Sequence, residues 1–299
     1  MLGSLPFAVL VTKPPAAIAK PADYQAVPWL IRRQAVTVVP APSSLVALRR
    51  FAAEKHATDP FAGFGDPIFD GSDAKRGIDA ASLYRGAEAS EADLRRLPRL
   101  PETADELRAE AKALGAPDSS LHLGPGANIT ALRQLDLSRT RVLSFATHGL
   151  VAGDLPQLGE PALVLTPPAR PTSEDDGLLR ASEVSKLKLD ADFVILSACN
   201  TAASDGAPGA EGLSGLAKAF FYAGARSLLV SHWPVDSEAT VKLTTGLIRA
   251  TAVNPAIGRA EALQGAMLAM IDDPGNGAEH AHPFFWAPFI LAGEGGPGR

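Results

Sequence analysis

The sequence predicts an α/β protein with a mostly parallel central sheet that helices cover on both faces. Unbroken apolar runs at residues 142–146 and 193–199 are typical of parallel strands buried on both faces. Such runs alternate along the chain with amphipathic segments of helical period, as in βαβ folds. The length of 299 residues and a hydrophobic content of 46% provide enough apolar surface for such a core.

The elements of the first half follow from local signals. Short apolar runs predict strands, and the Pro-rich stretch up to Pro28 is incompatible with a helix. Helices are predicted where an N-cap such as Ser44 or an acidic first turn precedes a helical apolar period, and where Gly115 ends one. The expected strands are 5–11, 35–39, 61–69, 121–123 and 142–146, and the expected helices are 45–55, 101–114 and 128–135.

The second half continues the alternation. Gly224 ends an amphipathic helix, and Trp233-Pro234 ends the strand that follows it. The expected strands are 161–165, 193–199, 227–232 and 284–291, and the expected helices are 178–187, 213–223, 237–251 and 257–271. Residues 70–99 are charged, contain glycine and show weak periodicity, so we expect a flexible surface insertion there. We expect one domain over residues 1–299.

Composition excludes several function classes. A net charge of −5 with scattered Lys and Arg argues against nucleic acid or an anionic membrane as a partner, although a basic polypeptide would suit it. The single cysteine excludes an internal disulfide and a cysteine-cluster metal site, and the six histidines lack metal-ligand spacing. We therefore expect no metal and no cofactor. No apolar segment is long enough for a bilayer, and the first apolar run lacks the basic residues of a signal peptide, so we expect a soluble, cytoplasmic protein.

Two residues in the sequence suggest nucleophilic chemistry. His148 follows one buried strand and Cys199 ends another, and ligand sites in open α/β sheets lie at the carboxyl ends of the strands. If the two strands are neighbours, the two side chains face each other. An imidazole lowers the pKa of a nearby thiol and later protonates the leaving group. The pair would then be the catalytic dyad of a cysteine hydrolase.

Four motifs together resemble the CHAT domain family of caspase-like peptidases, the group that includes separase, metacaspases and gingipains. They are ATHG at 146–149, LSACNTA at 196–202, GLSGLAKAFFYAGARSLLVSHWPV at 212–235 and WAPFILAG at 286–293. The likeness covers most of residues 121–293 and, more loosely, residues 5–115. It implies a caspase–haemoglobinase-like fold with His148 and Cys199 as the dyad. It also implies an oxyanion hole made by the backbone amides of Gly149 and Cys199.

The resemblance further implies substrate-binding positions. The residue two before the cysteine helps to form the pocket for the residue that precedes the scissile bond, and here it is Ser197, where metacaspases have an acid. A preference for Arg or Lys would need a carboxylate from elsewhere, and the candidates are Asp154, Asp205 and Glu211. Near residues 235–237 the family often has two consecutive acids, and Ser237 replaces the second; as Ser it can still cap the following helix.

Structural roles compete with each of these assignments. A single buried cysteine usually serves as a small apolar core residue. A catalytic role for Cys199 is favoured by the second buried strand, which leads to His148, and by the family motifs. For His232 a structural role is the better interpretation, and Trp233 and Trp286 are more simply explained as core or pocket wall. Asp154 and Glu211 are equally well explained as solvated loop residues. The glycine-rich segments at 63–65 and 206–212 match no dinucleotide or phosphate motif.

We therefore predict a cysteine endopeptidase that cleaves a protein substrate through a thioester, with a basic residue as one candidate for the cleavage site. The alternative is a catalytically silent or latent caspase-like module that binds a partner protein in the same cleft. A cysteine hydrolase acting on a small amide is a third hypothesis. Family members often carry sensory repeats, and none is found in these residues, so a regulator is either a separate protein, such as a repeat-containing one, or absent.

Overall fold

The computed structural model describes residues 5–39, 45, 46, 49, 57–69, 94, 97–152, 154, 158–172, 174–198, 215–233, 235–273 and 278–298. Most of the predicted insertion and most of the predicted helix at 45–55 lie outside these residues. Cys199, Asp205 and Glu211 also lie outside them.

In the described part of the chain, six strands form a central sheet in the order β2-β1-β3-β7-β8-β9. Neighbouring strands are parallel, except that β9 runs antiparallel to β8. The prediction of a mostly parallel α/β sheet is therefore confirmed. The strands are β1 (Asp59–Gly65), β2 (Leu121–Leu123), β3 (Thr140–Ala146), β7 (Phe193–Leu196), β8 (Ser227–Ser231) and β9 (Phe289–Gly293).

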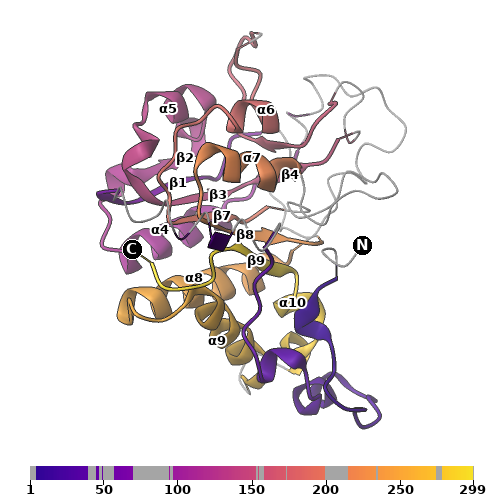
Figure 1. The fold of residues 1–299 in the computed structure, drawn as a ribbon. Helices are drawn as coiled ribbons and strands as arrows, with labels where there is room; N and C mark the ends of the chain where they lie inside the picture. Colours follow the sequence, from indigo (N-terminus) through magenta and orange to yellow (C-terminus); the bar gives the residue numbers. More distant parts are fainter. Residues whose placement is uncertain are drawn as a thin grey trace.

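Helices cover both faces of the sheet (Figure 1). One face is covered by α4 (Glu102–Ala113), α8 (Ser237–Val253) and α9 (Arg259–Asp272). The other face is covered by α5 (Ile129–Gln134), α6 (Ala181–Val184) and α7 (Gly215–Ala223). Apart from α6, these helices lie within a few residues of their predicted positions. Their ends follow the expected signals: the Asn128 side chain accepts a hydrogen bond from the Ala131 N–H, and Gly224 adopts φ +117° after α7.

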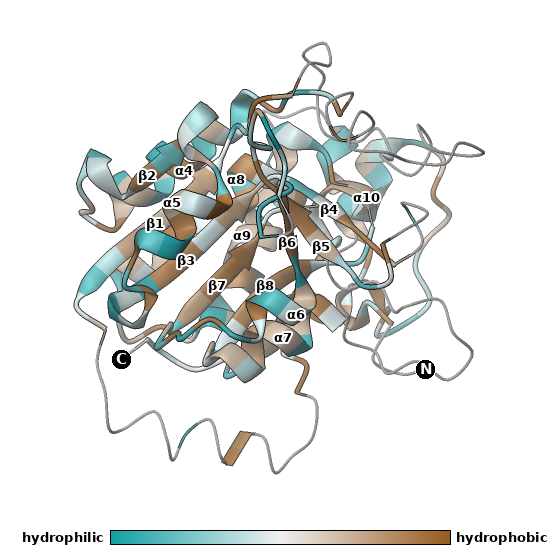
Figure 2. Cartoon of the chain, turned by 90° about the horizontal axis from the view of Figure 1, so that it is seen from above, coloured by the Kyte–Doolittle hydropathy of each residue, from teal (hydrophilic) through white to brown (hydrophobic). Residues whose placement is uncertain are grey.

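The unbroken apolar runs are explained by burial on both faces of the central strands. In β7, Phe193 and Ile195 belong to the core beneath α8 and α9, whereas Val194 and Leu196 belong to the core beneath α5 and α7. A strand with only one buried face would alternate apolar and polar residues. Figure 2 shows the same pattern, because β7 is mostly brown, whereas the helices around the sheet also carry teal residues.

A second, smaller sheet was not predicted. Among the described residues it has three antiparallel strands in the order β4-β5-β6, which are β4 (His148–Leu150), β5 (Ala162–Val164) and β6 (Leu178–Arg180). The expected helix at 178–187 is therefore wrong in its first three residues, and α6 is short. Pairing of Leu178 with Val164 decides the conformation there. The sequence did not predict this strand, because three residues are too few to show the period of a strand.

The two strands predicted near the N-terminus are not formed. Residues 7–9 instead make the 3-10 helix η2 (Phe7–Val9), in which the Val9 N–H donates to the Pro6 carbonyl at 3.0 Å. Within 35–39 only Val38 forms a bridge, which is parallel and connects it to Ala292 of β9. Two hydrogen bonds, from the Val38 N–H to the Leu291 carbonyl and from the Gly293 N–H to the Val38 carbonyl, hold this single contact.

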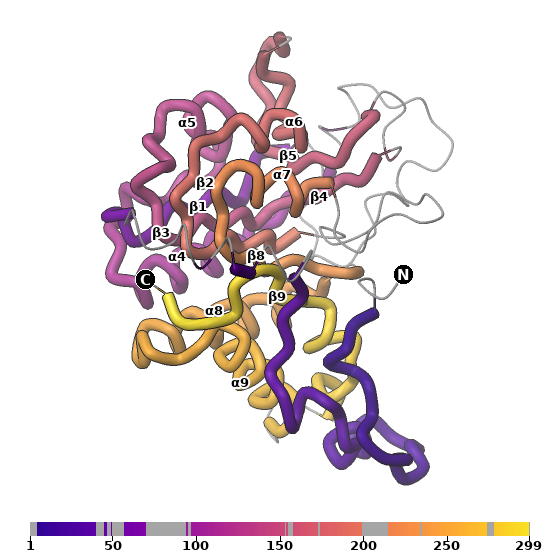
Figure 3. The backbone as a smooth tube through the Cα atoms, in the orientation of Figure 1, coloured from indigo at the N-terminus to yellow at the C-terminus, as the bar shows by residue number. Residues whose placement is uncertain are grey.

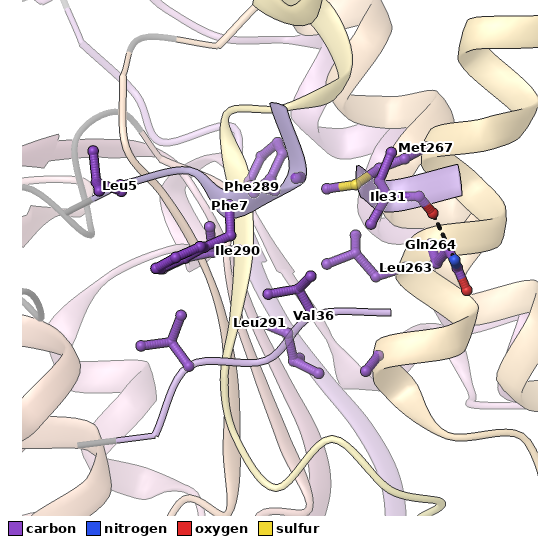
Figure 4. A pocket seen from close by; sticks show the side chains of 13 residues that line it. Leu5, Phe7, Ile31, Val36, Leu263, Gln264, Met267, Phe289, Ile290 and Leu291 are labelled. Atoms are coloured by element: carbon purple, nitrogen blue, oxygen red, sulfur yellow. Dashed lines mark hydrogen bonds between the residues drawn. The ribbon is translucent and has the colours of Figure 1, made fainter. Parts of the chain in front are cut away.

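The N-terminal segment packs on the helical layer formed by α8 and α9. In Figure 3 the indigo chain runs down beside this layer, and Ile31 belongs to its hydrophobic core. Figure 4 shows the small apolar pocket that lies between this segment, α9 and β9, with Phe7, Met267 and Ile290 among its lining side chains. The Gln264 side chain donates to the Ile31 carbonyl at 2.6 Å, which links the segment to α9.

The strand predicted at 284–291 begins later than expected. Residues 283–286 form the short helix α10 (Pro283–Trp286), and β9 starts at Phe289. Pro283 favours a helical first turn, and His282 Nδ1 accepts a hydrogen bond from the Phe284 N–H at 3.1 Å. Trp286 is fully buried and its indole N–H donates to the Ala281 carbonyl, so its expected role in the core is confirmed.

Candidate active site

The candidate site lies where β1, β3 and β7 end. The predicted neighbour relation is confirmed, because β3 and β7 are adjacent and parallel, with Val142 opposite Phe193 and Phe145 opposite Leu196. On the other side of β3, Ala146 pairs with Gly65 at the end of β1. The residues that follow these three strands therefore start from one edge of the sheet, where α/β folds bind their ligands.

The chain that leads to Cys199 is fixed from both sides. The Ser197 N–H donates to the Phe145 carbonyl of β3 at 2.8 Å, and the Ser231 hydroxyl of β8 donates to the Ala198 carbonyl at 2.6 Å. Ser197 and Ala198 are both completely buried. The backbone is therefore held in place as far as Ala198. Cys199 itself lies outside the described residues.

His148 is the first residue of β4 and lies directly beyond the end of β3. Thr147, between the two strands, donates its hydroxyl hydrogen to the Val164 carbonyl of β5 and so fixes the turn from one sheet to the other. The His148 residue is only 5% exposed. Its Nε2 lies 2.8 Å from the Pro98 carbonyl oxygen, and its ring lies 5.6 Å from that of Phe69, centroid to centroid.

The contact with Pro98 determines the tautomer of His148. A carbonyl oxygen can only accept, so Nε2 must carry the hydrogen in this hydrogen bond. In the neutral ring Nδ1 then holds the lone pair and is the nitrogen that can take a proton. This is the protonation state that a general base requires.

Sequence reasoning missed three residues of this edge. Pro98 contributes a backbone carbonyl, which no side-chain motif can reveal. Phe69 contacts the His148 ring, and Asp66, the residue after β1, accepts two hydrogen bonds from Arg99 at 2.9 Å each. A signal for Asp66 did exist, because it is an acid directly after a buried strand, but the sequence-based prediction placed it inside a strand over 61–69 and gave it no role.

The remaining predicted site residues are placed as follows. Gly149 lies in β4 opposite Leu163, next to His148. Asp154 accepts a hydrogen bond from the Val151 N–H at 2.7 Å, so its carboxylate stabilises its own loop. Asp205 and Glu211 lie outside the described residues. None of these positions tests a contact with substrate.

His232 lies after β8, where its backbone N–H donates to the Pro288 carbonyl at 2.8 Å. Its ring stacks on Trp233, and within the described chain no hydrogen-bond partner is found for its Nε2. Burial lowers the pKa of His232 below its usual value of 6.5. This environment is that of a structural histidine, as the sequence suggested.

The lowered pKa predicts a pH-dependent stability. Because the unfolded chain binds the proton more readily, the free energy of unfolding should decrease as the pH falls from about 6.5 towards the folded pKa. His232→Gln is expected to make this decrease smaller, whereas the contribution of His122, whose pKa burial also lowers, should remain. Urea unfolding of both proteins from neutral pH to about pH 5 measures the difference. Identical pH dependences would contradict the prediction.

Two features are absent from the described residues. These residues contain no group of three or more His, Cys, Asp or Glu side chains that could hold a metal ion. They also contain no helix with the length and apolar character needed to span a membrane.

The profile of the CHAT domain family matches residues 1–294. The chain belongs to the CHAT domain family. This confirms the resemblance that the four sequence motifs suggested, and membership supports a cysteine protease at the level of the family. No curated protein sequence matches this CHAT domain.

Several solved structures resemble this CHAT domain at low identity. Gingipain R, described as an Arg-specific cysteine proteinase, shows 10% identity and a TM-score of 0.47, over 86% of this chain and 52% of that one. The separase–securin complex of Saccharomyces cerevisiae shows 14% identity and a TM-score of 0.47, over 87% of this chain and 14% of that one. The complex of the pro- and mature domains of RgpB from Porphyromonas gingivalis shows 9% identity and a TM-score of 0.45, over 83% of this chain and 51% of that one. This chain thus spans about half the length of the gingipain chains and far less of separase.

Proposed function

We propose that this CHAT domain is a cysteine endopeptidase that cleaves a polypeptide with Cys199 as nucleophile and His148 as general base and acid. The observation that carries the proposal is the placement of His148. It is buried at the end of β3, beside the strand that leads to Cys199, and its tautomer is fixed by the Pro98 carbonyl.

The pairing of β3 and β7 supports a short distance between the two side chains. Val142 pairs with Phe193 across a separation of 51 residues along the chain, and Cys199 follows His148 by the same 51 residues. Residues 148 and 199 therefore each lie three positions beyond the paired residues Phe145 and Leu196. The hydrogen bonds of Ser197 and Ala198 to β3 and β8 hold the β7 chain in line up to the last residue before the cysteine.

The proposed reaction follows from these roles. His148 Nδ1 takes the thiol proton, and the Cys199 thiolate attacks the carbonyl carbon of the scissile peptide bond. The imidazolium gives the proton to the leaving amine, which leaves a thioester on Cys199. Nδ1 then takes a proton from water, the hydroxide attacks the thioester, and the thiol is released with a carboxylate product. The Pro98 carbonyl stabilises the imidazolium stage by accepting from Nε2.

The remaining predicted residues complete the proposed site. The backbone amides of Gly149 and Cys199 would donate to the oxyanion of the tetrahedral intermediate, and a glycine leaves space for the carbonyl to approach. Ser197 would help to shape the pocket for the residue that precedes the scissile bond, although its own side chain is completely buried. A carboxylate from Asp154, Asp205 or Glu211 would favour a basic residue in that pocket.

A positional peptide library tests the proposal with the wild-type protein and Cys199→Ala side by side. We expect the wild type to cleave a subset of peptides, with Arg and Lys as candidate residues before the cleaved bond, and the Ala variant to cleave none while its circular dichroism spectrum is unchanged. Cleavage by the Ala variant would refute Cys199 as the nucleophile.

Labelling with a thiol-directed electrophile separates the enzyme from its main alternative. An activated thiolate reacts quickly near neutral pH, whereas a buried thiol without a base does not. Fast labelling that requires His148 supports the peptidase. If the protein is neither labelled nor able to cleave peptides, the result would instead support a regulatory module that binds a partner protein in the same cleft. A separate regulatory protein would then be the first partner to seek.

A further inference from the structure

An ion pair connects the segment that carries Pro98 to the end of β1. Arg99 Nε donates to Asp66 Oδ1 and Arg99 Nη2 donates to Asp66 Oδ2, each at 2.9 Å. A guanidinium that contacts both oxygens of a carboxylate is restrained in direction as well as in distance. The contact therefore fixes the orientation of the Arg99 side chain more strongly than a single hydrogen bond would.

Asp66 is itself held rigidly. Its backbone adopts φ +49°, in the left-handed region that Asp and Asn tolerate better than most residues. Its N–H donates to the Thr103 hydroxyl at 2.7 Å, and that hydroxyl donates to the Leu100 carbonyl at 2.7 Å. Asp66 thus contacts the 97–100 segment through the Arg99 side chain and, by way of Thr103, through the Leu100 backbone.

These contacts determine where the Pro98 carbonyl points. That carbonyl belongs to the peptide group between Pro98 and Arg99, and the proline ring already restricts φ on its own side. Leu97 and Leu100 are buried in the core and anchor the segment at both ends. The ion pair with Asp66 adds a side-chain restraint on Arg99, the residue that shares this peptide group.

We propose that Asp66 and Arg99 are positioning residues for His148: their ion pair holds the Pro98 carbonyl against Nε2 and so keeps Nδ1 as the nitrogen that takes the proton. The catalytic part of this inference rests on the proposed function, whereas the effect on the tautomer does not. Phe69, three residues after Asp66, contacts the imidazole as well, so one short segment restrains His148 in two ways.

Nitrogen NMR of the imidazoles and steady-state kinetics together test the inference in Asp66→Asn and Arg99→Gln. Asn tolerates the left-handed backbone at position 66, which keeps the turn intact. The chain has six histidines, so the His148 signal is assigned as the one that is lost in His148→Gln. Wild type should show only the Nε2-protonated tautomer. Both variants should show the Nδ1-protonated form as well, with kcat lower by about 10- to 100-fold and KM within about twofold.

Two further variants test whether the residues act as a pair. Arg99→Lys keeps the charge but cannot contact both oxygens in the same plane, so it should give an intermediate kcat. The double variant Asp66→Asn/Arg99→Gln should lose no more than either single variant, because each change removes the same interaction. Losses that multiply in the double variant would contradict the inference.

Arg139→Gln is the matched control. The Arg139–Asp59 ion pair lies at the start of β1, whereas Asp66 follows the end of β1. Both ion pairs have two contacts, but the Arg139–Asp59 pair is exposed. This variant should keep the wild-type tautomer and kcat. A wild-type tautomer in both Asp66→Asn and Arg99→Gln would overturn the inference, and a rise in KM alone would assign Asp66 to substrate binding instead. Absence of cleavage by the wild type would refute the proposed function, and the tautomer would still decide the positioning role.

Discussion

His148→Gln is expected to lower kcat for peptide cleavage by about 10²- to 10⁴-fold, the usual contribution of a general acid–base residue. The Gln side chain can still donate to the Pro98 carbonyl, so the variant should keep the fold and lose only the proton transfer. Steady-state kinetics on the best peptide from the library measures the loss. The rate of thiol alkylation at neutral pH should fall as well, because no imidazole then accepts the thiol proton.

Ser144→Ala is a matched control for this prediction. Ser144 lies in the same strand that leads to His148 and is completely buried, and no partner for its hydroxyl is found among the described residues. Its replacement should leave both kcat and the alkylation rate unchanged. Wild-type kcat in His148→Gln would exclude His148 as the base.

Asp192→Asn is expected to lower the free energy of unfolding by about 3 to 5 kcal/mol, the usual cost of removing one partner from a buried ion pair. Asp192 lies just before β7 and accepts from Arg226 at 3.0 Å, and Arg259 Nη2 lies 3.9 Å away. The three side chains are only 5%, 10% and 5% exposed, respectively. Asn has nearly the same shape, so urea unfolding of this variant measures the loss of charge rather than the loss of volume.

The surroundings of Asp192 explain why this loss should be large. Arg141 also lies 3.9 Å from the carboxylate, so three guanidinium groups are gathered around one acid at the amino ends of the central strands. Burial lowers the pKa of Arg259 to about 10, and the Asp192 charge acts in the opposite direction. Without that charge, two buried cations would lose their nearest carboxylate.

Two comparisons make the stability prediction specific. Arg226→Met should cost less than Asp192→Asn, because Asp192 would still have Arg141 and Arg259 within 3.9 Å. Asp59→Asn should cost no more than about 1 kcal/mol, because the ion pair of Asp59 with Arg139 is largely exposed to solvent. Equal losses in Asp192→Asn and Asp59→Asn would contradict a special role for the buried carboxylate.

The central sheet was predictable because burial on both faces leaves a direct mark on the sequence. Strands β3 and β7 and the helices α4, α5, α7, α8 and α9 lie close to the positions that apolar period and capping residues indicate. The second sheet left no such mark. Its strands have three residues each, and β6 lies in a segment with a helical period, so pairing with β5 overrides local preference.

The sequence by itself determined the fold class and the family motifs, and it led to the proposal of His148 and Cys199 as the reactive pair, because these depend on residue types and on their order along the chain. Only the tertiary structure decided which nitrogen of His148 carries the hydrogen, and that Asp66 forms an ion pair with Arg99, the residue after Pro98. A backbone carbonyl is the same in every residue, and Pro98 lies 50 residues before His148. Contacts of that kind arise only when folding brings distant segments together.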